Sequence, residues 1–238
     1  MYKDKIVIIT GANGGIGKVL VEGYAKKGFK VIAVDINNYN FNNDNIDFYE
    51  VDLKCETQIN DFFIKIKSKY KKVHILINNA SIAHFNKSIF EIKNQEFNDI
   101  IDVNIRASFI FCKEFVKLNQ GEDYGRIINI SSTRFNQNEA NWEAYGTSKG
   151  GIISLTNSLC VSLSNTPITV NAISPGWIEN NDYDNLTDLD QSQHPSGRVG
   201  NPKDILNTSL FLTDIENDFI NGANIIVDGG MTKRMIYF

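Results

Sequence analysis

The chain has few residues that would tie it to disulfide or metal chemistry. It holds only three cysteines and three histidines in 238 residues. Cys55, Cys112 and Cys160 lie far apart and form no Cys-x-x-Cys pair, and the histidines share no spacing typical of metal ligands. We therefore expect no metal site, and we interpret the cysteines as small buried residues of a protein in a reducing, cytoplasmic compartment.

Two further absences narrow the class of protein. No apolar run approaches the ~18 residues that span a bilayer, and the segment "MYKDKIVIIT" lacks the pattern of a signal peptide. The net charge is −4, and basic residues are mixed with acidic ones rather than gathered in a stripe. We therefore expect neither a membrane nor a nucleic acid as a partner.

Apolar runs and helical patterns alternate along the chain. The runs are nearly continuous, which favours strands buried on both faces of a parallel sheet. They lie at 5–10, 30–35, 73–80, 125–132, 168–175 and 223–230, with a weaker one at 47–53. Helical spacing fills the intervals, most extensively at 95–118 and 143–164. The pattern predicts an α/β fold: a doubly wound (Rossmann-type) parallel sheet of seven strands with helices on both faces, in a single domain over 1–238.

Local signals mark some ends of these elements. Gly28 provides a helix stop, and Asn201 can cap a helix that has Pro202 at its first position. The Asn-rich stretch 37–45 predicts an exposed loop. The stretch 178–197 carries five acids with no Lys or Arg, and a loop of this length suggests a lid. Its charge suggests that the entrance disfavours anionic substrates.

A glycine-rich turn follows the first predicted strand. Its sequence, "TGANGGIG", spans 10–17 and leads into a helix. Glycines in this position let the backbone approach a pyrophosphate, and the helix N-terminus offers free N–H groups to it. Asp35 ends the second strand at a distance suited to hydrogen bonds with an adenosine ribose. A carboxylate there repels a 2′-phosphate and Ile36 is not basic, so NAD is favoured over NADP, although Lys18 could soften the preference.

The segment "EAYGTSKGG" places Tyr145 and Lys149 four residues apart, one turn along a helix. Such a pair suits proton transfer, because an ammonium favours the phenolate and lowers the pKa of the tyrosine. Roughly one match of this spacing is expected by chance, so the pair is weak evidence alone.

Nine motifs in order make the chain resemble the short-chain dehydrogenase/reductase family, in its compact single-domain branch. They are "TGANGGIG" (10–17), "DL" (52–53), "NNAS" (78–81), "VN" (103–104), "NISS" (129–132), "YGTSK" (145–149), "NAISPGWI" (171–178) and, late in the chain, "RVGNPKDI" with "VDGGMT". The resemblance implies an NAD(P)-dependent oxidoreductase of a small-molecule alcohol or ketone. It implies that the cofactor contacts Gly11, Asn13, Gly15, Ile16, Gly17, Asp35, Ile36, Asp52, Leu53, Asn79, Ala80, Ser81, Tyr145, Lys149, Pro175, Gly176 and Ile178.

The resemblance also implies a catalytic set. Tyr145 is the acid/base, Lys149 tunes it and holds the nicotinamide ribose, and Asn104 supports a water that relays protons to Lys149. The family's spacing selects Ser132, thirteen residues before Tyr145, as the serine that binds the substrate oxygen, and Ser131 is expected to point to the other face. Two departures are Ser81, where the family usually has glycine, and Asn180, where a threonine often contacts the cofactor.

Alternatives remain at this point. A 3-ketoacyl-thioester reductase using NADPH shares all these motifs, and a non-catalytic dinucleotide-binding sensor would share the fold. Family members commonly pair the two long helices between subunits, so a homo-oligomer, a tetramer, is expected. The apolar end of the tail at 231–238 is expected to be buried in an interface. His84 follows "NNAS" and is interpreted as a solvated loop residue.

Overall fold

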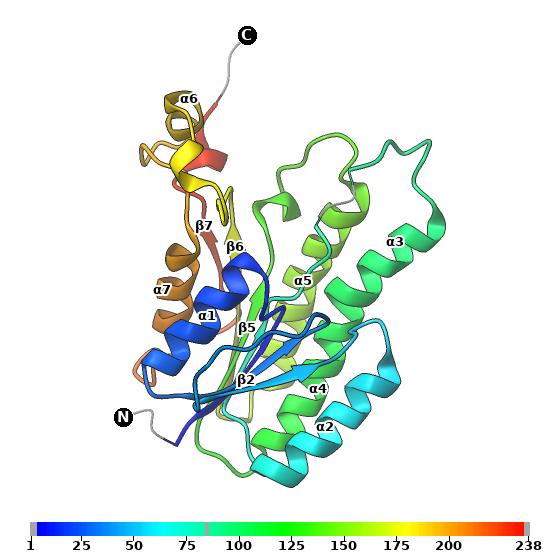
Figure 1. The fold of residues 1–238 in the computed structure, drawn as a ribbon, viewed down its shortest axis with the longest axis vertical. Helices are drawn as coiled ribbons and strands as arrows, with labels where there is room; N and C mark the ends of the chain where they lie inside the picture. Colours follow the sequence, from blue (N-terminus) through cyan, green and yellow to red (C-terminus); the bar gives the residue numbers. More distant parts are fainter. Residues whose placement is uncertain (1–3, 84–85, 236–238) are drawn as a thin grey trace.

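A single parallel sheet of seven strands forms the centre of the molecule (Figure 1). The computed structural model describes residues 4–83 and 86–235. The strands follow the order β3-β2-β1-β4-β5-β6-β7, as expected for a doubly wound sheet. Their bounds are β1 Ile6–Thr10, β2 Lys30–Asp35, β3 Ile46–Glu50, β4 Ile75–Asn78, β5 Gly125–Ile130, β6 Ile168–Pro175 and β7 Asn224–Val227. The predicted fold class is confirmed.

Helices cover both faces of this sheet (Figure 1). One face carries α1 and α7, and the other carries α2, α4 and α5. The bounds are α1 Gly15–Lys26, α2 Glu56–Tyr70, α3 Asn94–Ile101, α4 Ala107–Asn119, α5 Glu143–Ser162, α6 Asp188–Ser192 and α7 Pro202–Leu212. Every residue of β4, β5 and β6 is buried, which explains why these strands read as continuous apolar runs rather than alternating ones.

The helix predicted over 95–118 contains an irregular turn. The chain runs from α3 through a π-helical segment, Asp102–Arg106, into α4 without leaving the helical path. A π-helical turn inserts one residue into the ladder and frees a backbone group, and such turns are frequent at functional sites. The sequence pattern did not predict it, because hydrophobic spacing does not reveal one inserted residue. Asn104 lies inside this turn.

The predicted helix ends are confirmed. Gly28 has a φ of 93° and follows α1, where only glycine fits without strain. The Asn201 side chain accepts a hydrogen bond of 3.0 Å from the Lys203 N–H, with Pro202 at the first position of α7. The Asn-rich stretch 37–45 forms no helix or strand. No helix in the part of the chain that the structure describes is long and apolar enough to cross a membrane.

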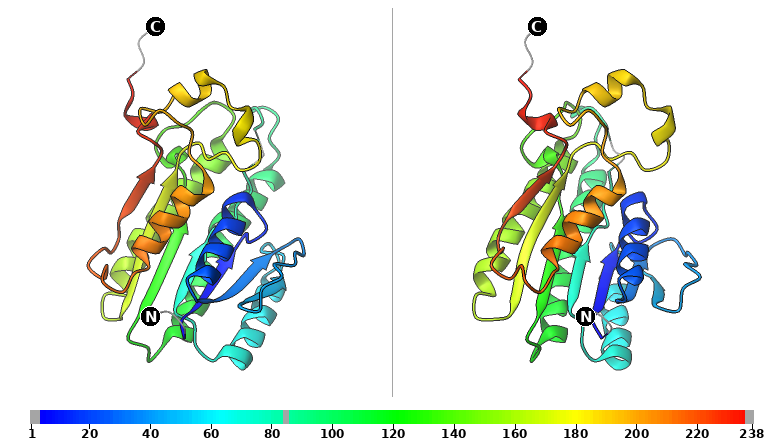
Figure 2. Two further views of the ribbon diagram at one scale, coloured as in Figure 1. Left: turned by 60° about the vertical axis from the view of Figure 1, so that its left-hand side comes forward. Right: turned by 90° about the vertical axis from the view of Figure 1, so that its left-hand side faces the viewer.

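The stretch 178–197, which we call the lid segment, is more ordered than its sequence suggested. It contains a short 3₁₀ turn, Tyr183–Asn185, and the five-residue helix α6. The Thr187 and Asp190 side chains cap α6 reciprocally. Figure 2 shows α6 beyond the carboxyl ends of the strands, so the lid segment lies at the edge of the sheet where ligands of such folds bind.

Candidate active site

A cavity of about 560 Å³ opens beside the glycine turn. We call it the glycine-turn cavity. It is formed where β1, β2, β3 and β4 end, and it contains eleven of the residues predicted to bind a cofactor: Gly11, Gly15, Ile16, Gly17, Asp35, Ile36, Asp52, Leu53, Asn79, Ala80 and Ser81. Asn180 of the lid segment also lines it. The predicted dinucleotide residues are therefore brought together.

The turn itself can only be built from glycine at several positions. Gly11 has a φ of 64°, and a Cβ there would lie 2.7 Å from the Ala80 Cα. A Cβ on Gly17 would lie 1.9 Å from the Gly11 carbonyl oxygen. Gly14 caps α1 without a side-chain hydrogen bond, so the first N–H groups of this helix are directed at the cavity without a capping side chain. This cradle fits the pyrophosphate of a dinucleotide.

The Asp35 carboxylate joins the glycine turn to the loop after β2. Its Oδ2 atom accepts a hydrogen bond of 2.9 Å from the Asn13 N–H, and its Oδ1 atom accepts one of 3.1 Å from the Asn37 N–H. Asn13 therefore meets Asp35 through its backbone and does not line the cavity. The Lys18 ammonium lies 4.3 Å from the centre of the Tyr39 ring, in the Asn-rich loop.

Asn79 holds the end of β4 against the end of β1. Its side-chain amide donates to the carbonyls of Thr10 and Gly11, both at 3.0 Å, and its N–H donates to the Thr10 hydroxyl at the same distance. The Ala80 N–H donates to the same hydroxyl at 3.1 Å. Because these hydrogen bonds join the end of β4 to the end of β1, Asn79 holds together the part of the chain from which the glycine-turn cavity is built.

Tyr145 and Lys149 lie on one face of α5, as their spacing predicted. The Lys149 side chain is buried, and its Nζ atom lies 5.4 Å from the centre of the Tyr145 ring. Nζ donates a hydrogen bond of 2.9 Å to the Ile130 carbonyl at the end of β5. Burial lowers the pKa of Lys149 to about 7.

The pKa of Tyr145 shifts in the opposite direction to the expected one. Burial raises it, and hydrogen bonds with Ser132 and Ser81 and the charge of Arg134 offset part of that rise. Lys149 is not among the causes that act on the phenol. Because the pKa of Lys149 is lowered to about 7, this lysine is largely neutral at the pH where the phenol would ionise.

The two serines after β5 have different surroundings. The Ser131 hydroxyl is buried and donates a hydrogen bond of 2.8 Å to the Lys149 carbonyl. Ser132 interacts with the Tyr145 hydroxyl and accepts a hydrogen bond of 3.2 Å from the Arg134 N–H. Ser132 therefore faces the phenol and Ser131 anchors α5, in agreement with the alternation expected along the strand.

Asn104 ties three segments together from inside the π-helical turn. Its Oδ1 atom accepts from the Ile82 N–H at 2.8 Å, and its Nδ2 atom donates to the Ile82 carbonyl at 3.2 Å and to the Ser148 hydroxyl at 2.9 Å. The Ser108 hydroxyl donates to the Asn104 carbonyl at 3.0 Å. The side chain thus links the loop after β4 to α5, one residue from Lys149.

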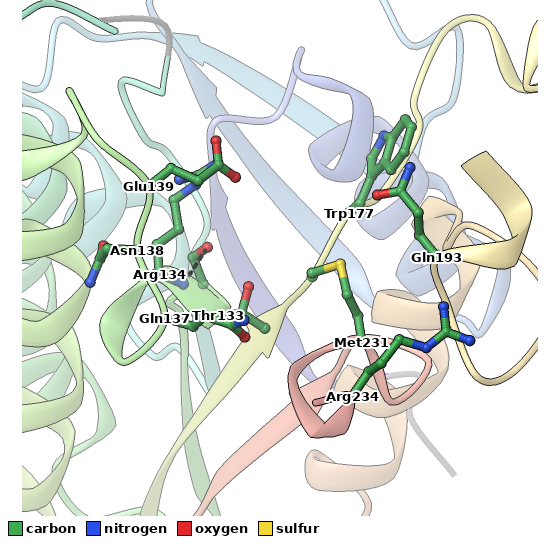
Figure 3. Close-up of a pocket in the computed structure, with 11 residues that line it drawn as sticks. Thr133, Arg134, Gln137, Asn138, Glu139, Trp177, Gln193, Met231 and Arg234 are labelled. Carbon is green, nitrogen blue, oxygen red and sulfur yellow. Dashed lines mark hydrogen bonds and ion pairs between the residues drawn. The ribbon is translucent and has the colours of Figure 1, made fainter. Parts of the chain in front are cut away.

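A second cavity, of about 570 Å³, begins at Ser132. We call it the Ser132 cavity. Its wall combines the loop after β5 with the lid segment and the segment after β7 (Figure 3), and its residues are Ser132, Thr133, Arg134, Gln137, Asn138, Glu139, Gly176, Trp177, Gln193, Met231 and Arg234. None of the five lid acids lines it. The phenol–serine pair thus has a space beside it of the size that small ligands occupy.

Known proteins resemble the chain over its whole length. A family model described as enoyl-(acyl carrier protein) reductase matches residues 11–232. An uncharacterized oxidoreductase of Thermotoga maritima is 38% identical over an alignment 258 positions long, which covers 100% of this chain and 99% of that one. A 3-oxoacyl-[acyl-carrier-protein] reductase of Rickettsia bellii is 35% identical over 234 residues, which cover 94% of this chain and 95% of that one. These matches decide the family.

The chain is a short-chain dehydrogenase/reductase. Solved structures of the same fold include a SCOR enzyme from Clostridium thermocellum, with a TM-score of 0.90, 37% identity and coverage of 98% of this chain and 95% of that one. A 4-hydroxyisoleucine dehydrogenase complexed with NADH has a TM-score of 0.90 and 31% identity, covering 97% and 100%. The protein called ElxO, with NADP bound, has a TM-score of 0.88 and 29% identity, covering 97% and 99%. The chain is accordingly an NAD(P)-dependent oxidoreductase.

Some predicted residues of this short-chain dehydrogenase/reductase lie away from the glycine-turn cavity. Pro175 is buried at the end of β6, and Gly176 lines the Ser132 cavity. Ile178 pairs with Gly200 in an isolated bridge and lines a separate hollow beside α7. Asn180 does reach the glycine turn, where a Cβ on Gly15 would lie 2.4 Å from its side chain.

Two residues near the phenol were not predicted to act there. Ser81 was predicted to contact the cofactor, and its side chain also interacts with the Tyr145 hydroxyl. Arg134 had no predicted role, and it lines the Ser132 cavity two residues after Ser132. No spacing rule marks either residue, although Arg134 lies only two residues after Ser132 in the sequence.

His74 and His194 line neither of the two cavities. His74 is buried, and its Nδ1 atom accepts a hydrogen bond of 3.1 Å from the Ile6 N–H. His194 is a buried residue of the lid segment, with the centre of its ring 6.1 Å from that of the Trp177 ring. His84 lies outside the described residues, as does the end of the tail. Among the residues described, no group of three or more His, Cys, Asp or Glu could hold a metal ion.

Proposed function

We propose that this short-chain dehydrogenase/reductase uses NAD(H) to interconvert a secondary alcohol and a ketone, with Tyr145 as the acid/base. The observation that carries the proposal is the meeting of the phenol with Ser132 at the end of β5, over the buried Lys149. A binding protein without catalysis has no need of a buried ammonium beside a phenol, since burial of that charge opposes folding.

The groups present suit the two directions of this reaction. Bound nicotinamide supplies the hydride acceptor or donor: ketone + NADH + H⁺ gives alcohol + NAD⁺. Because burial keeps the Tyr145 phenol protonated at neutral pH, it can give its proton to the carbonyl oxygen during reduction. The Ser132 hydroxyl stabilises the charge that develops on that oxygen. The Lys149 side chain lies against the Tyr145 ring. Asn104 fixes the loop after β4 to α5 beside this lysine, through its hydrogen bonds to Ile82 and Ser148.

The preference for NAD rests on the end of β2. Asp35, Ile36 and Asn37 line the glycine-turn cavity, and none is basic. The carboxylate of Asp35 repels a 2′-phosphate, while the ammonium of Lys18 is engaged with the Tyr39 ring. A neighbour of the same fold binds NADP, so the family membership alone does not choose the cofactor.

A panel of ketones and secondary alcohols, assayed with NAD(H) and NADP(H) in parallel, tests the function. We expect turnover with at least one class and a higher kcat/KM with NAD(H). Absence of any turnover, with tight binding of NADH, would favour a non-catalytic dinucleotide sensor. A higher kcat/KM with NADP(H) would contradict the role given to Asp35.

A second candidate is reduction of a 3-oxoacyl thioester with NADPH. The observation that favours it is the similarity to a reductase of that name at 35% identity. Acetoacetyl-coenzyme A is a direct probe. Turnover of this thioester with NADPH at a kcat/KM above that of every free ketone would replace our first proposal.

We infer a homo-oligomer, a tetramer, from the outer faces of the long helices. Phe109 on α4 is 47% exposed and Val161 on α5 is 73% exposed, and both are large apolar side chains. Family members pair these helices between subunits, and such pairing would cover both residues. Light scattering of the purified protein measures the assembly: a mass near 107 kDa, about four times the 26.8 kDa of the chain, is expected, and a monomer would refute it.

A cytoplasmic setting is the remaining part of the proposal. Cys55, Cys112 and Cys160 are free thiols, which suits a reducing compartment. The protein is extracted under denaturing conditions with an alkylating agent, and its mass is expected to show all three cysteines alkylated, which means that they were reduced in the cell.

A further inference from the structure

The Ser132 cavity is positively charged where its lining carries charge. Arg134 and Arg234 line it against a single acid, Glu139 (Figure 3). None of the five acids of the lid segment, from which the sequence suggested repulsion of anions, lines this cavity, and some of them form hydrogen bonds within the lid segment itself. Glu179 accepts backbone hydrogen bonds at 2.9–3.2 Å from Asn180 and its two successors, and Asp190 caps α6. The charge that meets a substrate at this cavity is therefore cationic rather than acidic.

Arg134 has hydrogen-bonding capacity to spare. Its Nη2 atom donates to Glu139 at 2.8 Å, but its buried Nη1 atom has no hydrogen-bond partner among the described residues. A guanidinium offers five donors in a planar fork that matches a carboxylate. An unsatisfied buried donor is costly. Nη1 is itself closed off from the cavity, so a ligand carboxylate would bind through the side of the guanidinium that Glu139 now contacts.

The guanidinium is also held in place. Its carbon atom lies 4.2 Å from the centre of the Trp142 ring, and the Trp142 ring lies 5.6 Å from that of Tyr145. The Arg134 backbone N–H donates to the Ser132 hydroxyl oxygen at 3.2 Å. The guanidinium charge acts on the Tyr145 phenol, and Arg134 lines the cavity that begins at Ser132, so a carboxylate on Arg134 would share that cavity with the reacting carbonyl.

The partner that Arg134 now has is weakly held. The Glu139 side chain is 71% exposed, whereas that of Arg134 is 21% exposed. Ion pairs with one solvated partner contribute little, because water competes for the charge. A substrate carboxylate in the cavity can therefore share or replace Glu139 without a large loss.

We propose that the substrate is a small oxo or hydroxy acid whose carboxylate binds Arg134 while its carbonyl or hydroxyl oxygen meets Tyr145 and Ser132. The inference rests on the proposed function and adds the substrate class to it. The balanced reaction is oxo acid + NADH + H⁺ giving hydroxy acid + NAD⁺. Two electrons arrive as hydride at the carbonyl carbon, and the proton arrives at its oxygen from Tyr145.

The test compares acids with their methyl esters. 2-Oxobutanoate, 3-oxobutanoate and 4-oxopentanoate, each beside its methyl ester, are reduced with NADH by the intact enzyme. We expect the best acid to exceed its ester in kcat/KM by about tenfold or more, because a charged hydrogen-bonded pair is lost in the ester. The length of the best acid reports how far Arg134 lies from the reacting carbon.

Three variants locate the effect at Arg134. Arg134→Gln is expected to lower kcat/KM for the acid about 100-fold and for the ester less than about threefold. Arg134→Lys keeps the positive charge but lacks the planar set of guanidinium donors, and it should recover part of the lost kcat/KM for the acid. Glu139→Gln removes the competing carboxylate and should raise kcat/KM for the acid. Lys26→Gln, an exposed cation at the end of α1, is the matched control for loss of one positive charge.

A binding readout accompanies the kinetics. The chain has two tryptophans, Trp142 stacked on Arg134 and Trp177 in the cavity wall, so tryptophan fluorescence reports on this region alone. Titration with 3-hydroxybutanoate should change the fluorescence of the wild type at a concentration at least tenfold below that needed by Arg134→Gln. The methyl ester should show no such difference.

The outcomes separate the two proposals. Equal kcat/KM for acids and esters, or an equal loss on both in Arg134→Gln, would overturn the carboxylate site and leave the oxidoreductase assignment standing. Turnover of neutral ketones with none of any acid would do the same. No turnover of acids, esters or neutral ketones, with no fluorescence response to 3-hydroxybutanoate, would overturn both.

Discussion

Lys149 reaches past the Tyr145 ring, with its Nζ atom 5.4 Å from the ring centre, to donate a hydrogen bond of 2.9 Å to the Ile130 carbonyl. Burial is the cause that lowers its pKa, and no acidic side chain offsets it. A charge in this position is opposed by burial, and it is stabilised by the Ile130 carbonyl and by the face of the Tyr145 ring rather than by a carboxylate. The burial of this lysine is therefore expected to lower the stability of the folded protein.

This burial makes stability depend on pH. Between about 7, the pKa of Lys149 in the folded protein, and 10.5, its ordinary value, the unfolded chain binds a proton here that the folded chain lacks. The free energy of unfolding should thus rise with pH across this window, by about 1.4 kcal/mol per pH unit. The difference in Tm between the wild type and Lys149→Met should therefore change with pH in favour of the wild type, by roughly 2–4 °C for each kcal/mol of free energy of unfolding.

Thermal unfolding of both proteins at pH 7.5 and pH 9.5 measures this slope. The hydrogen bond to Ile130 is lost at both pH values, so it cancels in the comparison. A difference in Tm that stays constant with pH would mean that Lys149 keeps its ordinary pKa in the folded protein.

Substitutions of the two serines after β5 should affect different quantities, kcat for Ser132 and the free energy of unfolding for Ser131. Ser132→Ala should lower kcat about 10²–10³-fold, as expected when a donor to the reacting oxygen is removed, with little change in Tm. Ser131→Ala should lower the free energy of unfolding by about 1–3 kcal/mol, because the Lys149 carbonyl loses its buried donor. Steady-state kinetics and thermal unfolding of both variants check the split. The reverse pattern would exchange the roles assigned to the two hydroxyls.

Ser81 should affect the pH profile. Its hydrogen bond lowers the pKa of Tyr145, so Ser81→Ala should raise that pKa. Alcohol oxidation requires the phenolate, and its rate should rise with pH through the pKa of Tyr145. In Ser81→Ala the rising limb for kcat/KM of oxidation should move to higher pH. An unmoved limb would show that Ser81 leaves the phenol during turnover.

The choice of cofactor should follow the charge of Asp35. Asp35→Asn keeps an oxygen for the Asn13 N–H and removes the charge, so the kcat/KM ratio of NAD to NADP should fall about 10²-fold. Asp52→Asn, the other acid of the glycine-turn cavity, is the control and should leave the ratio nearly unchanged. Equal ratios in wild type and Asp35→Asn would exclude repulsion as the source of the preference.

The fold was predictable because its signals are local and repeated. Continuous apolar runs gave the seven strands, and residues such as Gly28 and Asn201 marked helix ends by their own backbone chemistry. The π-helical turn around Asn104 was not predictable, because it depends on one inserted residue whose backbone group is satisfied by Ser108. The cap of α6 by Thr187 and Asp190 likewise emerged only in the structure.

The sequence predicted which residues lie together at the site better than it predicted the pKa of Tyr145. Motif spacing selected Ser132 over Ser131 and placed Tyr145 over Lys149. The predicted direction of the shift in the pKa of Tyr145 was wrong, because spacing along a helix does not show where the end of a long side chain lies. Lys149 ends at the Ile130 carbonyl, and Arg134, from another segment, supplies the charge that acts on the phenol.

The most direct test of the central claim is Tyr145→Phe, measured for turnover and for NADH binding by nicotinamide fluorescence. Removal of the phenolic oxygen should lower kcat about 10²–10⁴-fold and change the Kd for NADH less than about threefold. Tyr49→Phe, on the edge strand β3, is the matched control and should change neither quantity. Turnover in Tyr145→Phe within a few-fold of the wild type would contradict the assignment of this phenol as the acid/base.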